Sequence, residues 1–216
     1  MQLNNYIDHT LLKPTATPAD IKNLCTEAKT YEFYAVCVNG SYVGLATSML
    51  KGSNVKVAAV VGFPLGAMST EAKIAEALDC VENGAAEIDM VINLGLLKGG
   101  HFKAIEDEIS SIKKAIGDVV LKVIIETCYL TEEEKEGACK AAMKANADFV
   151  KTSTGFGPGG ATPEDVQLMK KIVGDQLQVK ASGGIKDENT ALQYLELGAS
   201  RLGTSSGVEL VTKQED

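Results

Sequence analysis

Strand signals alternate with helix signals along the chain, and this alternation restricts the fold more than any other feature. Eight strand–helix units follow one another within 216 residues. The predicted strands are Ile7–Leu11, Ala35–Val38, Val55–Val61, Ala86–Ile92, Val119–Ile125, Asp148–Lys151, Gln178–Ala181 and Arg201–Gly203. The predicted helices lie near Pro18–Thr30, Tyr42–Leu50, Thr70–Glu82, His101–Ile116, Glu132–Ala145 and Glu188–Leu197, with one more opening at Thr162 and a short one beginning in Ser205–Gly207.

Three helix-to-strand junctions share one composition, in which Gly or Asn ends the helix and small residues lead into the strand. They are Asn83-Gly84-Ala85-Ala86, Ala145-Asn146-Ala147-Asp148 and Leu197-Gly198-Ala199-Ser200. Such junctions are typical of repeated right-handed βαβ units. Since no linker or low-complexity segment divides the chain, we predict one domain, residues 1–216, folded as a closed (β/α)8 barrel. An open doubly wound sheet is the alternative, although no G-x-G-x-x-G follows the first strand.

The composition limits the class of protein. A net charge of −8 argues against nucleic acid and anionic membranes as partners. Five scattered cysteines without C-x-x-C, no signal-like N-terminus and no apolar run of about 18 residues predict a cytoplasmic protein with free thiols. The two histidines, His9 and His101, lie far apart and form no metal-binding motif, so we expect no metal site.

Side chains alternate along each strand between the barrel interior and the surrounding helices. Val150 suits the helix-facing side, so Lys151 points inward near the mouth. The same argument places Glu87, Asp89, Lys122, Glu126 and Lys180 inside. Glu87 and Lys122 lie deeper on adjacent strands and predict a structural ion-pair network. Lys151 and Lys180 lie nearer the mouth, where active sites of this fold gather.

Lys151 ends its predicted strand, and a glycine-rich loop, Thr152–Gly160, follows at once. A lysine inside a core is usually kept for chemistry or for a buried ion pair. Its ordinary pKa of about 10.4 must fall by about three units before it is nucleophilic at neutral pH. Burial and the charge of Lys180 both act in that direction. We therefore predict Lys151 as a Schiff-base nucleophile, with Asp89 and Lys180 in proton transfer.

Glycine-rich loops after the last three strands are candidates for phosphate binding. They contain Gly155, Gly183-Gly184 and Gly203–Gly207, and the last of them opens a short helix. Glycines let backbone N–H groups approach an anion, and the loops after strands seven and eight are the usual phosphate site of this fold. Each glycine pair alone is weak support, because turns also need glycine. Cys37 is interpreted as a small core residue rather than a nucleophile, although it is placed to line the pocket.

Nearly the whole chain resembles the deoxyribose-phosphate aldolase family. The resemblance is carried by Tyr6–Pro14, Glu87–Asn93, Leu121–Thr127, Phe149–Phe156 and Val179–Ile185. It implies a class I aldolase on a (β/α)8 barrel, with no metal and no cofactor. Such an enzyme reversibly cleaves 2-deoxy-D-ribose 5-phosphate into D-glyceraldehyde 3-phosphate and acetaldehyde. The resemblance implies that the partners are small phosphosugars and aldehydes.

The resemblance also assigns roles to residues. It implies that Lys151 forms the Schiff base and that Asp89 and Lys180 transfer protons. Asp8, Thr10 and Cys37 match positions near the sugar. The positions that match the loops around the phosphate are Thr154, Gly155, Gly183, Gly184, Ser205 and Ser206.

Two departures from the family pattern stand out. Some members carry a phosphate-binding lysine where this chain has Phe156, and some longer members end in a tyrosine that this chain lacks. Two alternatives stay open: another Schiff-base phosphosugar aldolase, and a phosphosugar-binding barrel without catalysis. The sequence leaves the oligomeric state open, with a homodimer as one arrangement.

Overall fold

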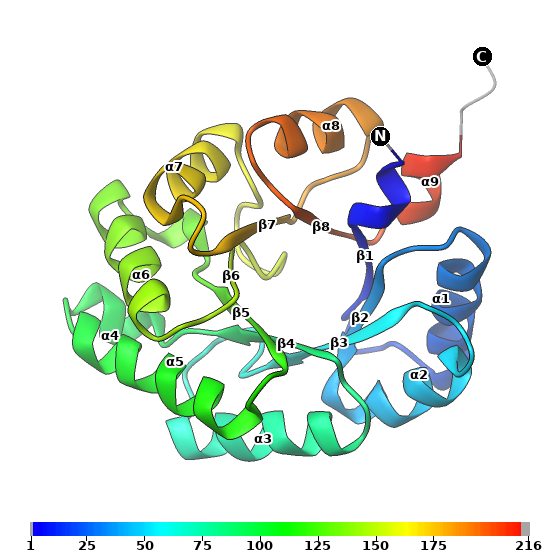
Figure 1. The fold of residues 1–216 in the computed structure, drawn as a ribbon, viewed down its shortest axis with the longest axis horizontal. Coiled ribbons are helices and arrows are strands. Elements are labelled where there is room, and N and C mark those ends of the chain that lie inside the picture. The colour runs from blue at the N-terminus through cyan, green and yellow to red at the C-terminus, as the bar shows by residue number, and fades with distance from the viewer. Residues whose placement is uncertain (1, 213–216) are drawn as a thin grey trace.

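The computed structural model describes residues 2–212, which form a closed barrel of parallel strands (Figure 1). Each strand pairs with the next along the chain, and the eighth pairs with the first. The closure confirms the predicted (β/α)8 barrel and excludes the open sheet. The strands are β1 (Ile7–Leu11), β2 (Ala35–Asn39), β3 (Lys56–Val61), β4 (Glu87–Val91), β5 (Val120–Ile124), β6 (Phe149–Lys151), β7 (Gln178–Ser182) and β8 (Arg201–Thr204).

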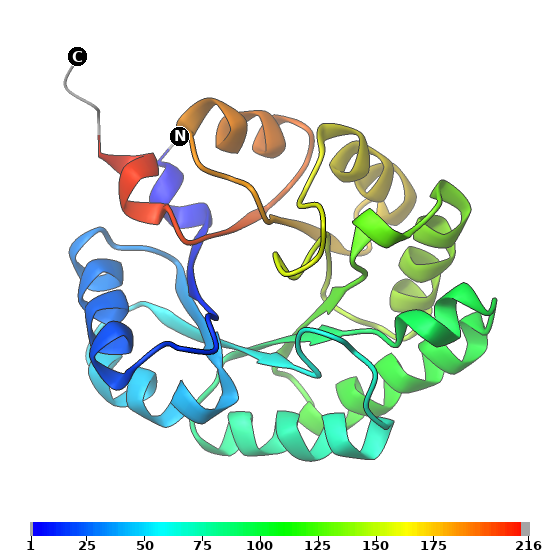
Figure 2. The same ribbon diagram turned by 180° about the vertical axis from the view of Figure 1, so that it is seen from behind.

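Helices surround the strands on the outside of the ring (Figures 1 and 2). They are α1 (Pro18–Thr30), α2 (Val43–Leu50), α3 (Thr70–Glu82), α4 (Leu94–Lys98), α5 (Phe102–Ile116), α6 (Glu132–Lys144), α7 (Pro163–Val173), α8 (Glu188–Glu196) and α9 (Gly207–Val211). Three 3-10 helices add to these: η1 (Leu3–Tyr6), η2 (Gly40–Tyr42) and η3 (Thr127–Tyr129). The predicted helices are present with shifts of one or two residues at some ends.

Helix starts follow the sequence closely, while one short helix was not predicted. Thr17 and Thr162 are N-caps, and each side chain accepts a hydrogen bond from the backbone N–H three residues later. A proline follows each cap at the first helical position. The helix missed was α4, whose N-cap is Asn93; the Asn93 side chain accepts a hydrogen bond from the backbone N–H of Leu96. Its five residues are too few to give a periodic apolar pattern.

The apolar core has two parts. The larger part lies between the outer face of the strands and the helices, where Ile88 and Met90 of β4 are fully buried. The smaller part lies inside the barrel and contains Cys37 of β2, Ala58 and Val60 of β3, and Leu12 just after β1. Charged side chains point inward instead from β1, at Asp8, and from each strand from β4 to β8. The barrel interior is therefore divided into an apolar half and a charged half.

A buried ion pair outside the barrel secures the end of β4. Lys73 of α3 is fully buried, and its Nζ lies 2.7 Å from Oε1 of Glu108 on α5. The same ammonium donates to the carbonyl of Val91 at 2.8 Å, and Glu108 Oε2 accepts from the backbone N–H of Asn93 at 3.2 Å. Two helices thus hold the chain just beyond the strand that carries Asp89.

This ion pair yields a stability prediction. Lys73→Met leaves the Glu108 carboxylate buried without its cation, so the free energy of unfolding should fall by about 3–5 kcal/mol. The double change Lys73→Met, Glu108→Leu removes both charges and should cost much less. Lys103→Met on the exposed face of α5 is the matched control and should change little. Urea unfolding followed by circular dichroism measures all three, and equal losses in the two Lys73 variants would contradict the prediction.

Candidate active site

The candidate site lies at the end of the barrel where the strands finish, as expected for this fold. The loop after β6 reaches toward the centre of the ring there (Figure 2). A cavity of about 260 Å³ opens at this end. It is lined by Thr10, Leu11, Leu12, Lys13, Lys151, Thr154, Gly155, Phe156, Ser182, Gly183, Gly184, Ile185, Lys186, Gly203, Thr204 and Ser205.

Lys151 lies at the boundary between this cavity and the charged interior. Its side chain is almost fully buried yet lines the cavity. Its Nζ lies 2.8 Å from Oδ2 of Asp89. Lys151 and Lys180 are register partners on β6 and β7, as the alternation predicted. Lys180 lies deeper than expected, because it is fully buried and does not line the cavity.

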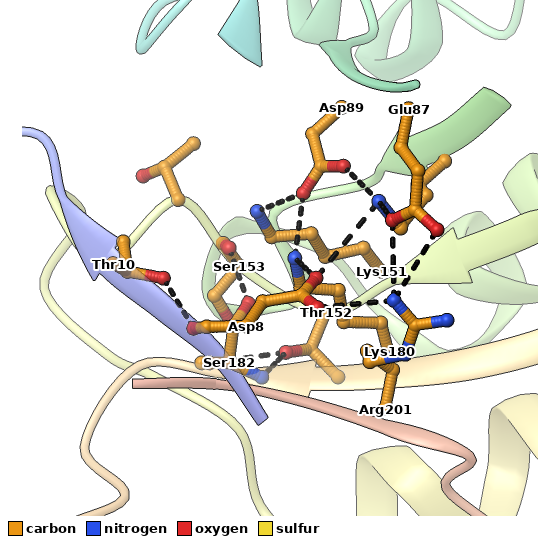
Figure 3. Close-up of polar contacts among 12 residues, drawn as sticks. Asp8, Thr10, Glu87, Asp89, Lys151, Thr152, Ser153, Lys180, Ser182 and Arg201 are labelled. Carbon is orange, nitrogen blue, oxygen red and sulfur yellow. Dashed lines mark hydrogen bonds and ion pairs between the residues drawn. The ribbon is translucent and has the colours of Figure 1, made fainter. Parts of the chain in front are cut away.

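Asp89 is the acceptor at the centre of the site (Figure 3). Its Oδ2 lies 2.8 Å from the Nζ atoms of both Lys151 and Lys180. Its Oδ1 lies 2.6 Å from Nζ of Lys122. Lys180 also binds the carboxylate of Asp8, and Lys122 lies 2.5 Å from Oε2 of Glu87. The predicted structural network and the candidate catalytic groups are therefore parts of one cluster.

The three lysines differ in how their charge is balanced. Burial lowers the pKa of Lys151, Asp89 opposes this in part, and Lys180 lowers it further, so the net shift is downward. Burial also disfavours the charge of Lys180, but Asp8 and Asp89 raise its pKa above the ordinary value. Burial and the charge of Lys180 also disfavour the charge of Lys122, but Asp89, Asp8 and Glu87 together raise its pKa. Lys151 is thus the amine of the three that loses its proton first.

Asp89 itself stays ionised. Burial alone would raise the pKa of its carboxyl, but Lys122, Lys151 and Lys180 together lower it well below the ordinary range. Asp89 is therefore suited to orient ammonium groups and to accept a proton only transiently.

Asp8 and Cys37 are both fully buried and do not line the cavity. Asp8 binds Lys180 and Arg201 beneath the cavity, while Thr10 on the same strand reaches it and donates to the Asp8 carbonyl. Cys37 packs in the apolar half of the interior, and burial raises the pKa of its thiol. Its interpretation as a small core residue agrees with this position.

The glycine loops meet at the edge of the cavity. Gly155, Gly183 and Gly184 all have positive φ, at 83°, 85° and 81°, which favours glycine. A Cβ on Gly160 would lie 2.2 Å from the carbonyl oxygen of Gly183, so the loops after β6 and β7 touch backbone to backbone. Neither loop has room for a side chain at this contact.

The loop after β8 contributes only in part. Ser205 lines the cavity, whereas Ser206 lines a neighbouring groove beside α1. The backbone N–H of Ser206 donates to the Thr204 hydroxyl at 2.9 Å. Gly207 is needed for packing, since a Cβ there would lie 2.8 Å from Nδ1 of His9. Of the predicted phosphate loop Gly203–Gly207, the cavity is lined by Gly203, Thr204 and Ser205.

A sequence model described as DeoC/LacD family aldolase matches residues 3–209. This chain belongs to that family. A deoxyribose-phosphate aldolase from Brevibacillus brevis is 56% identical over 212 residues, which cover 98% of this chain and 96% of the relative. The family assignment agrees with the resemblance drawn from the motifs.

Solved structures give the same result. A protein titled "QR15, an Aldolase" superposes with a TM-score of 0.93 at 42% identity, covering 97% of this chain and 94% of its own. A deoxyribose phosphate aldolase from Aeropyrum pernix, described as tetrameric, superposes with a TM-score of 0.89 at 34% identity, covering 97% and 89%. The chain is an aldolase, and its barrel superposes closely on those of solved aldolase structures.

Two further features of this aldolase concern metals and membranes. Among residues 2–212, His, Cys, Asp and Glu side chains form no group of three or more that is arranged to hold a metal ion. His9 is buried and its Nε2 lies 2.7 Å from the Glu27 carboxylate, while His101 is exposed at the start of α5. Of the helices in the described range, none is long and apolar enough to cross a bilayer.

Glu126 was placed in the barrel interior by strand alternation, and this was wrong. The strand ends at Ile124, and Glu126 follows with a left-handed φ of 53°. Its buried carboxylate accepts from the backbone N–H of Thr154 at 3.1 Å and from the Thr154 hydroxyl. Thr154 Oγ1 in turn accepts from the N–H of Phe156. Glu126 therefore shapes the loop after β6 rather than joining the lysine cluster.

Arg201 belongs to the site and was missed. Its guanidinium contacts Asp8 and Glu87 and lies 3.4 Å above the ring of Tyr34. The same alternation would have found it, since Leu202 is helix-facing and its neighbours on β8 must point inward.

Phe156 occupies the position of the absent phosphate-binding lysine. Its side chain is about half exposed at the mouth and packs edge-on against Phe63, with ring centroids 5.3 Å apart. Two other lysines, Lys13 and Lys186, line the cavity and are exposed. The C-terminal residues 213–216, where a terminal tyrosine would be sought, lie outside the described residues.

Gly203 gives the Lys180 side chain its space. A Cβ at this position would lie 3.1 Å from Cε of Lys180 and 2.9 Å from Cβ of Ser182. Because Lys180 is a predicted proton-transfer residue and small displacements of such groups are costly, we predict that Gly203→Ala displaces Lys180 and lowers kcat by about tenfold or more. Steady-state kinetics on the folded variant measures this.

Gly44→Ala in α2 is the matched control, since its nearest neighbouring atom would lie at 3.6 Å. It should leave kcat unchanged. A Gly203→Ala enzyme with full turnover would show that Lys180 has more freedom than its contacts indicate.

Proposed function

We propose that this aldolase reversibly cleaves 2-deoxy-D-ribose 5-phosphate into D-glyceraldehyde 3-phosphate and acetaldehyde through a Schiff base on Lys151. One observation supports the choice of lysine above all others. Of the three interior lysines, Lys151 alone lines the cavity, and it binds a carboxylate that it shares with the other two. The substrate is inferred from the named relatives, which are deoxyribose-phosphate aldolases.

The reaction begins with neutral Lys151, whose lowered pKa favours the free amine. Nζ attacks the C1 aldehyde, and loss of water gives an iminium ion. A base removes the C3 hydroxyl proton, the C2–C3 bond breaks, and its electron pair moves into the iminium to form an enamine. Glyceraldehyde 3-phosphate leaves, C2 of the enamine takes up a proton, and water hydrolyses the new iminium to acetaldehyde and free Lys151.

Asp89 and Lys180 serve the proton transfers in this proposal. Lys180 keeps its proton because its pKa is raised, so it acts as the acid of the pair. Asp89 Oδ2 contacts both ammonium groups at 2.8 Å and relays a proton between them. Lys180 is buried beneath the cavity, so its proton reaches the substrate through this contact rather than directly.

The phosphate is proposed to lie against the glycine loops. Gly155, Gly183 and Gly184 line the cavity, and residues without side chains allow backbone N–H groups to approach an anion there. Thr154 and Ser205 line the same space, and the exposed ammonium groups of Lys13 and Lys186 supply positive charge. These lysines compensate for Phe156 in the proposed phosphate site.

Reductive trapping tests the nucleophile. The protein is incubated with acetaldehyde and sodium borohydride, and peptide mapping should find one two-carbon adduct on Lys151. Lys151→Met should abolish the adduct and lower cleavage by at least about 10³-fold, since covalent catalysis is lost. The Lys13→Met variant, which removes another cavity lysine, should still form the adduct on Lys151. An adduct on Lys180 would reverse the assignment, and no adduct on folded protein would exclude the Schiff-base mechanism.

A comparison of phosphorylated and unphosphorylated substrate tests the phosphate loops. Gly183→Ala strains a positive φ and brings a Cβ within 2.9 Å of Gly160 Cα, so both loops must shift. KM for 2-deoxyribose 5-phosphate should rise about tenfold, while kinetics with 2-deoxyribose should change little. Gly174→Ala, with a φ of 53° and open space at the end of α7, is the strained control far from the cavity. Equal effects on both substrates would place the phosphate elsewhere.

A substrate panel separates this proposal from another Schiff-base phosphosugar aldolase, and membership of an aldolase family argues against the non-catalytic alternative.

We also propose a cytoplasmic location, which the five free cysteines support. A homo-oligomer is proposed as well, since one superposed relative is described as tetrameric. A homodimer is one such homo-oligomer.

A further inference from the structure

Six of the buried charges form a closed ring inside the barrel. Three carboxylates alternate with three cations, and each member contacts a neighbour on both sides. Figure 3 labels every member except Lys122. In order around the ring they are Asp89, Lys122, Glu87, Arg201, Asp8 and Lys180.

The half of the ring farther from the cavity is closed by Glu87 and Arg201. Glu87 Oε2 lies 2.5 Å from Lys122 Nζ and 3.1 Å from Arg201 Nη1. Arg201 Nη1 lies 3.0 Å from Asp8 Oδ1. Glu87 and Arg201 do not line the cavity and do not contact Lys151, so the proposed reaction leaves them without a role.

The ring is neutral by itself, because its three positive and three negative charges cancel. Lys151 is the seventh member of the cluster; within residues 2–212 its one carboxylate partner is Asp89, which already serves two ring cations. With all seven groups ionised, the cluster carries one excess positive charge in a low-dielectric interior. Loss of one proton removes the excess, and Lys151 is the cation with the fewest carboxylate partners.

We propose that Glu87 and Arg201 are positioning residues that set the protonation of Lys151 through the charge balance of this ring. The inference rests on the proposed function, since it assumes that Lys151 reacts as a neutral amine. It adds two residues to the machinery of the reaction. It also explains why so many charges are retained in one small barrel, because each of the three ring carboxylates contacts two ring cations and only Asp89 also binds Lys151.

Other charged groups near Lys151 do not complete this balance. Cys37 faces it from β2, and burial raises the pKa of that thiol, which favours its neutral form. Glu126 is buried in the loop after β5, but its carboxylate contacts Thr154 and Cys128 rather than any ring member. Lys13 and Lys186 line the cavity and are exposed, so solvent screens their charges.

The two residues should act in opposite directions. Glu87→Gln removes a negative charge, leaves two excess positive charges and should lower the pH at which Lys151 loses its proton by about one unit. Arg201→Gln removes a positive charge, balances the cluster with Lys151 protonated and should raise that pH by about one unit. The double variant restores one excess positive charge and should behave like the wild type.

The measurement is the rate of trapping on Lys151 with acetaldehyde and sodium cyanoborohydride as a function of pH, read by peptide mapping. The acid limb of kcat/KM against pH should move in the same way. Arg201→Lys keeps the charge and is the control, with an unchanged midpoint. Each variant is first shown to be folded by circular dichroism.

Opposite shifts that cancel in the double variant support the proposal, because a merely structural role would lower rates without moving the midpoints in opposite directions. Unchanged midpoints, shifts of the same sign, or a double variant displaced from the wild type would overturn it. If neither Gln variant folds, Glu87→Leu and Arg201→Met remove the same charges with apolar side chains, and they must show the same opposite shifts. Failure of the proposed function is distinct, because wild-type protein would then show no adduct on Lys151 at any pH.

Discussion

The carboxylate of Asp89, which binds three buried lysines, is the interaction on which the site depends. Charges taken out of water are tolerated only when they are paired, and an unpaired buried ammonium tends to lose its proton. Lys122 and Lys180 each have a second carboxylate, Glu87 and Asp8 respectively. Among residues 2–212, Lys151 has only its share of Asp89. Burial disfavours the charge of all three lysines, and the different numbers of carboxylate partners then give these chemically identical side chains different proton affinities.

The rest of the barrel supports this arrangement. Small and apolar residues on β2 and β3, such as Cys37 and Ala58, fill one side of the interior, and the charged cluster fills the other. The cavity opens above the charged side because Lys151 reaches it from the end of β6. Glycines at 160 and 183 let two loops meet backbone to backbone at its edge. The nucleophile and the proposed phosphate donors therefore lie at one mouth, as the parallel strands require.

Much of this was predictable because strand side chains alternate with a period of two. That rule correctly placed Lys151 and Lys180 on neighbouring strands and Glu87 beside Lys122. It failed at Glu126, because the strand had already ended and a left-handed residue turned the chain. Arg201 was overlooked because its strand is short, although its inward direction follows from the same rule.

The sequence by itself determined the order of strands and helices, the starts of the helices and the inward direction of the lysines. These depend on caps, glycines and alternation, which act between residues close along the chain. Only the tertiary structure decided which lysine lines the cavity, which carboxylates close the ring of buried charges, and which of Ser205 and Ser206 lines the cavity. Those choices depend on strand register and loop contacts between β1, β4 and β8, which bring together residues as distant as Asp8 and Arg201. Local sequence patterns do not determine such distances, because burial and Coulomb interactions depend on where the closed barrel places each group.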